Sequence, residues 1–285
     1  MNRAVFVLAL LITLPSHALQ VSVSPTETLE IAERSAVVKI DGKLDEAVWA
    51  SLDQYDEFVV IEPDTLVKPA HATWVSLFYN QLGLYVGVQV EQPPETRIAR
   101  LSSRDNRQIK RDSVGMVLDT SGEGRYGYWF GINLGDAQMD GTLLPEKQFT
   151  SDWDGAWEGA TSETQTGWTA EMFIPWGVVS MPKQAGARRI GLYMERFVAY
   201  KDERWSWPAL PDTVPQFISA LQSVSVKDVQ PKQQYSIFPS ASVTQDQIDG
   251  KTNYRAGADF FWRPSTNLQL TATINPDFGV AESDD

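Results

Sequence analysis

The chain has no cysteine and only two histidines, His17 and His71. Without thiols it can form neither a disulfide framework nor a cysteine nucleophile, so its fold must depend on a core or on metal. His17 falls in an N-terminal segment that we expect to be removed. The one remaining histidine excludes a zinc site built on several histidines and disfavours a Ser-His-Asp triad. No G-x-S-x-G motif is present either.

Long apolar runs are missing, with one exception at the N-terminus. Arg3 precedes an apolar stretch over residues 4–14, and Ser16 and Ala18 are small residues suited to cleavage after Ala18. This pattern predicts a signal peptide over residues 1–18 and an exported mature chain. No later segment approaches the roughly 20 apolar residues that a membrane-spanning helix needs.

Positive charge is also scarce. The 24 Lys and Arg residues are outnumbered by 37 Asp and Glu residues, which gives a formal net charge of −13. A chain this acidic repels phosphate backbones, so nucleic acid is not expected as a partner. The acidity is compatible with Ca²⁺ sites, which use carboxylate and carbonyl oxygens, or simply with solubility.

Most of the chain alternates apolar and polar residues with a period of two, as over residues 84–90, 114–118 and 168–174. Many such stripes with short turns and hardly any amphipathic helix predict an all-β fold, an antiparallel β-sandwich of jelly-roll-like type, over residues 19–228. One short helix is expected over residues 45–52, with Asp45 as its N-cap. The predicted core comprises Trp49, Val86, Val88, Met116, Leu118, Phe130, Trp168, Met172 and Phe197.

Four segments appear in a recognisable order: "IDGKLDEAVW", "DSVGMVLDT", "WDGAWEGAT" and "GWTAEMFIPW". Together they resemble the family 9 carbohydrate-binding module, a Ca²⁺-associated β-sandwich. They resemble still more closely the version of this module at the N-terminus of long bacterial outer-membrane proteins of unknown function. The resemblance covers roughly residues 40–226 and implies a binding module of the cell envelope.

The region 229–285 differs in character. Residues 231–234 suggest a linker, and residues 254–262 and 268–274 alternate around a predicted turn at 263–267. Paired strands with one apolar face match a hairpin of an outer-membrane barrel. One hairpin cannot close a barrel, so we expect the sequence to be a fragment of a longer chain.

In the sugar-binding modules of this family, two Trp rings clamp the terminal sugar, and an acidic residue after "DSV" contacts it. Here "RDNRQIKRDSVG" and "PALPDTVPQFISAL" have no Trp at the corresponding places, and Gly115 replaces the acid. Of the ten Trp residues, Trp49, Trp157, Trp168 and Trp205 are expected in the core. A sugar platform would then depend on residues predicted to be exposed, namely Trp74, Trp153 and Trp207. Arg104, Asn106 and Arg107 could make another polar site, or belong to a solvated loop.

The resemblance also implies Ca²⁺ in acidic loops, and Asp41, Asp45, Asp112 and Asp140 are the predicted ligands. Asp41-Gly42 and Asp140-Gly141 could instead be ordinary turn chemistry. The match of residues 122–127 to G-x-G-x-x-G is expected to be a hairpin turn, because a strand rather than a helix follows it.

Catalysis could rest only on paired carboxylates, such as Glu171 with Glu195, or a pair among Asp152, Asp154 and Glu158. No catalytic residue is assigned. The expected function is therefore envelope carbohydrate binding linked to uptake or catabolism, in the periplasm or outer membrane of a Gram-negative bacterium. A plug or docking domain without a sugar site is the alternative, and a glycoside-active enzyme is the third possibility.

Overall fold

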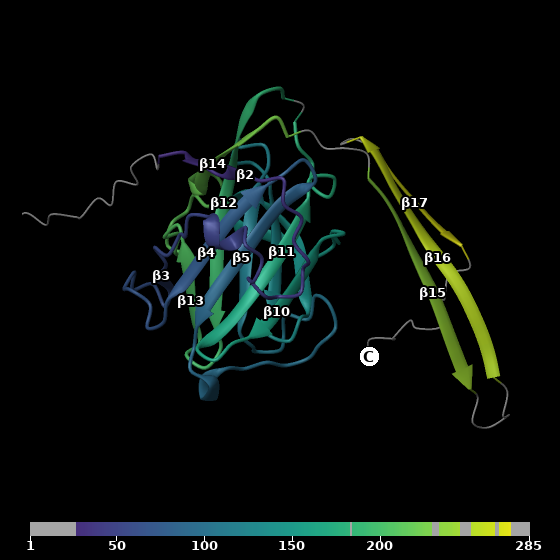
Figure 1. The fold of residues 1–285 in the computed structure, drawn as a ribbon, viewed down its shortest axis with the longest axis horizontal. Helices are drawn as coiled ribbons and strands as arrows, with labels where there is room; N and C mark the ends of the chain where they lie inside the picture. Colours follow the sequence, from purple (N-terminus) through teal and green to yellow (C-terminus); the bar gives the residue numbers. More distant parts are fainter. Residues whose placement is uncertain (1–26, 183, 230–233, 246–251, 266–267, 275–285) are drawn as a thin grey trace, which may run out of the picture.

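The computed structural model describes residues 27–182, 184–229, 234–245, 252–265 and 268–274 (Figure 1). The predicted signal peptide lies outside these ranges. Within them, the helical elements are four single 3₁₀ turns: η1 (Trp49–Ser51), η2 (Pro94–Thr96), η3 (Pro145–Lys147) and η4 (Ile218–Ala220). None of the described helices could cross a bilayer, because none is long and apolar enough.

Two sheets form the body of the protein (Figure 1). The larger has nine strands. Seven follow one another in the order β1 (Leu29–Glu30), β14 (Gln222–Lys227), β12 (Ala187–Val198), β6 (Ser113–Asp119), β7 (Gly127–Asn133), β8 (Gln138–Leu144) and β9 (Gln148–Thr150). The other two form a branch, in which β13 (Glu203–Trp207) pairs with β12 and β3 (Val59–Glu62) pairs with β13. The smaller has the order β10 (Glu158–Glu163), β11 (Gly167–Pro175), β5 (Gly83–Glu91), β4 (Thr73–Tyr79) and β2 (Ala32–Glu33).

Neighbouring strands run antiparallel except for the two-residue pairs β1–β14 and β2–β4, which are parallel. The predicted antiparallel β-sandwich is confirmed. The main core lies between the inner faces of the two sheets. Met116, Phe130 and Trp168 are fully buried there. Val86, Val88, Leu118 and Met172 also lie in this core, as predicted.

The prediction for Phe197 is wrong, because strand β12 has the opposite phase. Leu192, Met194 and Val198 face the core, whereas Phe197 is half-buried and lines a surface pocket. The misleading residue is Arg196, a charged side chain that is 0 % exposed in the apolar phase. It is accommodated because its guanidinium donates to the carbonyls of Ala72 and Glu91 and to two side-chain oxygens.

The predicted helix over residues 45–52 is shorter than expected and is not capped by Asp45. Only Trp49–Ser51 form a 3₁₀ turn, with Val48 at the N-cap position and no side-chain cap. Trp49 is buried as predicted, but with Phe78 and Tyr85 on the outer face of the five-stranded sheet rather than between the sheets.

A buried carboxylate fastens this N-terminal segment to the sheet. Glu171 on β11 is 0 % exposed, and it accepts hydrogen bonds from the backbone N–H groups of Asp41 and Gly42 and from Trp49 Nε1, at 3.0, 2.9 and 3.0 Å. Gly42 has φ of +82°, and a Cβ there would meet the Thr161 backbone at 2.4 Å. Burial raises the pKa of Glu171 to about 7, against the opposing effect of these donors.

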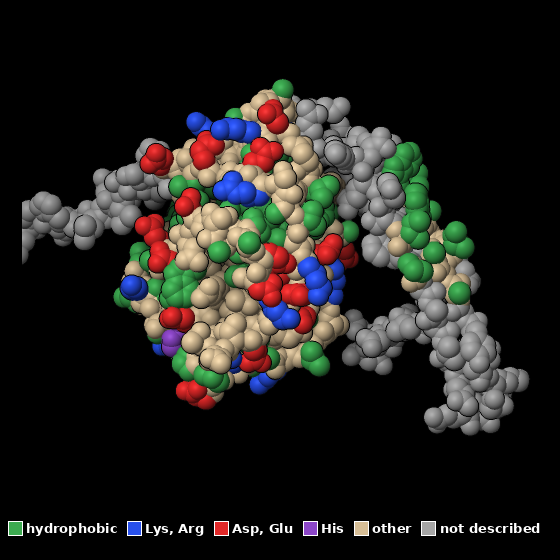
Figure 2. Space-filling model, viewed as in Figure 1, with side chains coloured by type: hydrophobic (Ala, Val, Ile, Leu, Met, Phe, Trp, Pro, Cys, Tyr) green, Lys and Arg blue, Asp and Glu red, His purple; other side chains and the backbone are tan. Residues whose placement is uncertain are grey.

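A third sheet is formed by β15 (Gln234–Gln245), β16 (Thr252–Ser265) and β17 (Leu268–Ile274), which pair antiparallel with one another. The sequence predicted the last two strands but assigned the start of β15 to a linker. The register places Ile237 opposite Phe260, and Trp262 opposite Leu270, on one apolar face. Figure 2 shows apolar side chains gathered along this sheet, and Ile237 and Ile274 are 63 % and 69 % exposed.

Candidate functional site

Three glycines leave the outer face of the nine-stranded sheet open at its centre. Gly115 on β6 lies directly opposite Gly131 on β7, and Gly141 on β8 lies opposite Trp129. A Cβ at these glycines would come within 3.0 Å of Glu195, 2.8 Å of Trp129 and 2.7 Å of Phe149, respectively. Glycine within a strand often marks a close approach, and here it lets the side chains of Glu195, Trp129 and Phe149 occupy the space directly above the sheet.

Those side chains are connected to one another. Trp129 Nε1 donates to Glu195 Oε1 at 2.9 Å, and Arg204 Nη1 donates to Glu195 Oε2 at 3.0 Å. Arg204 Nε also donates to Glu62 at 3.1 Å. The Glu195 carboxylate, which is the largest influence, raises the pKa of Arg204 further above its usual range. The carboxylate is therefore held between an indole and a guanidinium in a fixed orientation.

Aromatic rings form a wall beside this carboxylate. Trp129 and Phe149 meet edge to face, with ring centroids 5.5 Å apart. Arg107, from the segment before β6, lies over both, with its guanidinium carbon 4.0 Å from the Phe149 centroid and 5.2 Å from the Trp129 centroid. The wall thus joins flat apolar surface to a cation.

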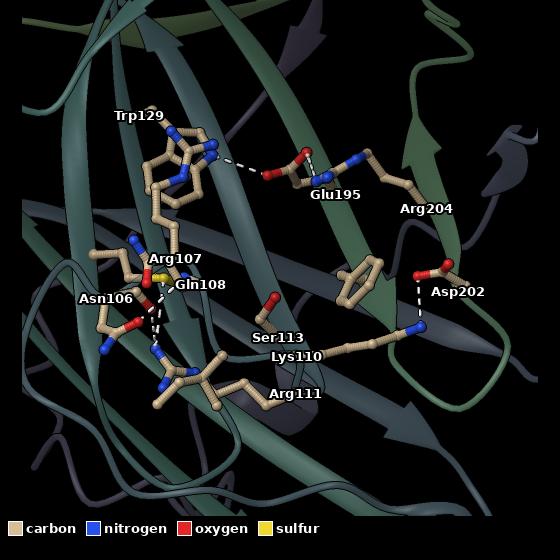
Figure 3. Close-up of a pocket in the computed structure, with 13 residues that line it drawn as sticks. Asn106, Arg107, Gln108, Lys110, Arg111, Ser113, Trp129, Glu195, Asp202 and Arg204 are labelled. Carbon is tan, nitrogen blue, oxygen red and sulfur yellow. Dashed lines mark hydrogen bonds and ion pairs between the residues drawn. The ribbon is translucent and has the colours of Figure 1, made fainter.

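Two adjoining pockets of about 240 and 320 Å³ open on this wall, and both are lined by Arg107, Trp129, Glu195 and Arg204. Asn106, Arg111 and Phe197 line the first as well, and Tyr193, Leu210 and Phe217 line the second. Figure 3 shows the first pocket, with the Trp129–Glu195–Arg204 chain along one side and the segment 106–111 along the other. Such a combination of apolar walls and a few oriented polar groups is typical of small-ligand sites.

The predicted ligand-binding residues do not gather in one place. Asn106 lines the pocket, but Trp207 is only 5 % exposed and stacks on Tyr55, so its predicted exposure is wrong. Trp153 is half-buried and packs on Tyr128 and Phe130. Trp74 is half-buried on β4, in the outward phase of the other sheet.

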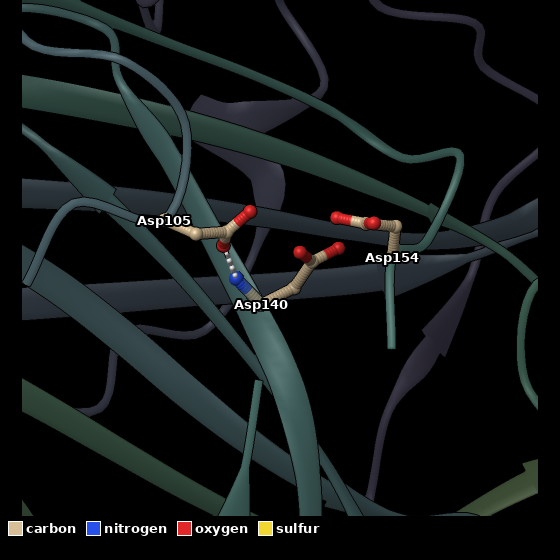
Figure 4. A group of neighbouring side chains, drawn as sticks. All are labelled: Asp105, Asp140 and Asp154. Carbon is tan, nitrogen blue, oxygen red and sulfur yellow. Dashed lines mark hydrogen bonds between the residues drawn. The ribbon is translucent and has the colours of Figure 1, made fainter. Parts of the chain in front are cut away.

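The carboxylates of Asp105, Asp140 and Asp154 lie close together (Figure 4). Arg104 forms ion pairs with this acidic group. Its Nη2 is 2.6 Å from Asp140 Oδ2, and its Nε lies 3.6 and 3.5 Å from the other two carboxylates. Asp140 is 1 % exposed and its second oxygen, Oδ1, has no hydrogen-bond partner in the described part of the chain. The oxygen set suits Ca²⁺, although Arg104 already supplies positive charge there.

The other predicted metal ligands have different roles. Asp112 is fully buried and accepts hydrogen bonds from Gln92 Nε2 and from the backbone of Ile98 and Ala199. Asp41 pairs with Lys39 and belongs to the turn held by Glu171, and Asp45 is exposed. Among the described residues, the group around Asp140 is the cluster whose carboxylate oxygens lie within 4.8 Å of one another.

Glu171 and Glu195 cannot act as a catalytic pair. Their strand neighbours Met172 and Met194 face the common core, so the two carboxylates lie on the opposite outer faces of different sheets. Packed sheets are roughly 10 Å apart at their backbones, which already exceeds the separation of glycosidase carboxylates. The G-x-G-x-x-G match at 122–127 is a connection between the paired strands β6 and β7, as expected.

Trp129, Phe149 and Arg204 were not predicted as site residues from the sequence. They come from β7, β9 and β13, which are far apart along the chain and meet only through strand pairing. A usable signal existed in the glycines at 115, 131 and 141 within otherwise regular strands. The structure also shows that Glu195 occupies the space above Gly115, so that a neighbouring strand supplies a carboxylate at the position where the resemblance predicted one.

Comparisons with known proteins agree with the fold. A candidate carbohydrate-binding protein from Bacteroides uniformis matches with a TM-score of 0.55 and 13% identity, covering 70% of this chain and 99% of that one. A family 9 carbohydrate-binding module from Caldicellulosiruptor kristjanssonii has a TM-score of 0.49 in complexes with cellotriose and with glucose. These two matches show 16% and 15% identity and cover 72% of this chain and 95% and 97% of those chains. No protein-family model and no curated protein matches the sequence.

Proposed function

We propose that this domain binds carbohydrate at the outer face of its nine-stranded sheet. The observation that carries the proposal is the aromatic wall of Trp129 and Phe149 beside the oriented Glu195–Arg204 pair. Pyranose rings present apolar C–H faces and a rim of hydroxyl groups. Aromatic rings suit the faces, while carboxylate and guanidinium groups suit the hydroxyls as acceptor and donor. The motif resemblance and the fold shared with the Bacteroides uniformis protein support the same ligand class.

Replacing Trp129 with alanine is expected to weaken sugar binding at least tenfold, about 1.4 kcal/mol, because it removes both apolar surface and the donor that orients Glu195. Calorimetry with cello-, xylo- and uronic acid oligosaccharides would measure this. Trp74→Ala is the matched control, since Trp74 is also half-buried but belongs to the other sheet. A larger loss in Trp74→Ala than in Trp129→Ala, or no binding to any of these sugars, would count against the site.

The cellular setting is part of the proposal. The N-terminal pattern of residues 1–18 supports export, and the apolar face of the third sheet supports attachment to an outer-membrane structure. The domain then serves carbohydrate uptake or catabolism in the periplasm or at the outer membrane of a Gram-negative bacterium.

The acidic group around Asp140 is the proposed Ca²⁺ site. Ca²⁺ that binds only the folded state should stabilise it by about 2.7 kcal/mol at a hundredfold excess over the dissociation constant. Thermal melting in excess CaCl₂ against excess EDTA would show a higher midpoint with calcium. Asp154→Asn should reduce that shift without unfolding the protein, because Asp154 is 73% exposed. Identical melting midpoints in CaCl₂ and EDTA would show that the domain is not stabilised by calcium.

A further inference from the structure

The positive side chains of the first pocket are unequally neutralised. Lys110 Nζ is paired with Asp202 at 2.7 Å. Arg204 is paired with both Glu62 and Glu195. Two other arginines line the same pocket, Arg107 and Arg111, and neither forms an ion pair with any carboxylate of the described chain. The described lining of the first pocket therefore has four cationic side chains against two carboxylates, Glu195 and Asp202, and Glu195 acts on Arg107 only from beyond ion-pair distance.

Arg111 is the more informative of the two because it is buried. It is 3 % exposed, and its Nη2 donates to the Asn106 carbonyl oxygen at 2.7 Å. Its Nη1 has no hydrogen-bond partner within the described ranges. A buried guanidinium without a counter-charge is costly, and a negative charge bound in the adjoining pocket would offset that charge.

The Arg107 side chain is held by aromatic rings rather than by hydrogen bonds. Its guanidinium carbon lies over the rings of Phe149 and Trp129, and no hydrogen bond joins its side chain to the rest of the described protein. The cation–π contacts hold the guanidinium beside the rings and leave its N–H groups without protein acceptors. A fork of parallel N–H groups matches the two oxygens of a planar carboxylate.

We infer that this pocket selects acidic carbohydrate, with the carboxylate of a hexuronic acid residue bound by Arg107 and attracted by the buried charge of Arg111. The inference rests on the proposed sugar site and names its substrate class. A short oligosaccharide with a few carboxylates fits a local positive charge, whereas the protein's net charge of −13 opposes long polyanions.

The test is calorimetry on the full mature chain at low and at physiological salt. The probes are trigalacturonic acid and xylotriose bearing a glucuronic acid branch, each compared with its own methyl ester, which keeps the sugar and removes the charge. The acids should bind at least tenfold more tightly than the esters, and this ratio should fall as salt increases. Arg107→Gln should reduce the ratio to about one. Arg125→Gln is the matched control, because Arg125 is 82% exposed in the β6–β7 turn, and it should leave the ratio unchanged.

Two outcomes would overturn the inference and can be told apart from failure of the site itself. If acids and esters bind equally and binding still depends on Trp129, the sugar site is supported but the pocket does not select acidic sugars. A sulfated galactose trisaccharide that binds as tightly as the uronates would remove the carboxylate assignment. If neither acids nor esters bind at all, the proposed function fails together with the inference. Because Arg107 is exposed, its replacement should not unfold the domain, and the melting midpoint of Arg107→Gln would verify that.

Discussion

Replacing Trp168 with alanine is expected to lower the free energy of unfolding by about 3–5 kcal/mol. Trp168 is 0 % exposed on β11, lies between the two sheets, and donates from Nε1 to Gln92 Oε1 at 3.2 Å. Truncation would leave a large cavity and would also remove the donor to Gln92, whose oxygen accepts from Arg196 as well. Because a domain of this size has only a modest net stability, the loss should appear as a large decrease in the denaturation midpoint.

Chemical denaturation of the wild type and of Trp168→Ala would measure this difference. Trp168→Phe is an informative second variant, because it retains much of the ring while removing the indole donor, and its loss should be smaller. An alanine variant with the same denaturation midpoint as the wild type would show that Trp168 does not face the core.

The second large effect is expected at Glu171. Glu171→Ala should destabilise the protein by about 3 kcal/mol or more, because three donors from Asp41, Gly42 and Trp49 lose their acceptor at once. A buried donor left unsatisfied costs about 1–3 kcal/mol. The loss should be accompanied by release of the segment around Trp49 from the outer face of the five-stranded sheet.

Denaturation together with limited proteolysis would test both parts of this expectation. New cleavage sites should appear near residues 40–52 in Glu171→Ala but not in Glu158→Ala, which replaces an exposed glutamate on the adjacent strand β10. If the two variants are equally stable, the hydrogen bonds to Glu171 do not hold this segment in place.

The architecture could be predicted from the sequence wherever the alternation of apolar and polar residues within a strand shows which residues face the core. Residues 84–90 and 168–174 alternate without interruption, and their inner residues are in the core. The phase of strand β12 was predicted wrongly because Arg196 occupies an apolar position, which depends on acceptors from β4 and β5 that the local pattern does not contain. The strand β15 was missed because the segment at its start resembled a linker in composition.

The site was less accessible than the fold for a physical reason. The exposure of a Trp side chain cannot be deduced from its own strand. Trp207 is covered by Tyr55, whereas Trp129 lies over Gly131, which has no side chain to fill that space. Glu195 was considered only as a catalytic acid, because its neighbours on β6 and β7 were not known. Pairing between strands, rather than spacing along the chain, determines which side chains share the pocket.

The first strand of the sandwich has a mechanical consequence. Leu29 and Glu30 pair in parallel with Val224 and Ser225 of β14, the last strand of the nine-stranded sheet. Tension between the two ends of the sandwich would therefore pull these strands along their length in opposite directions, loading their hydrogen bonds in shear. With only two residue pairs, this contact should part first. It would yield while the longer pairings of β12 with β14 and with β6 still hold, so a domain tethered at both ends could lengthen while its pocket keeps its shape.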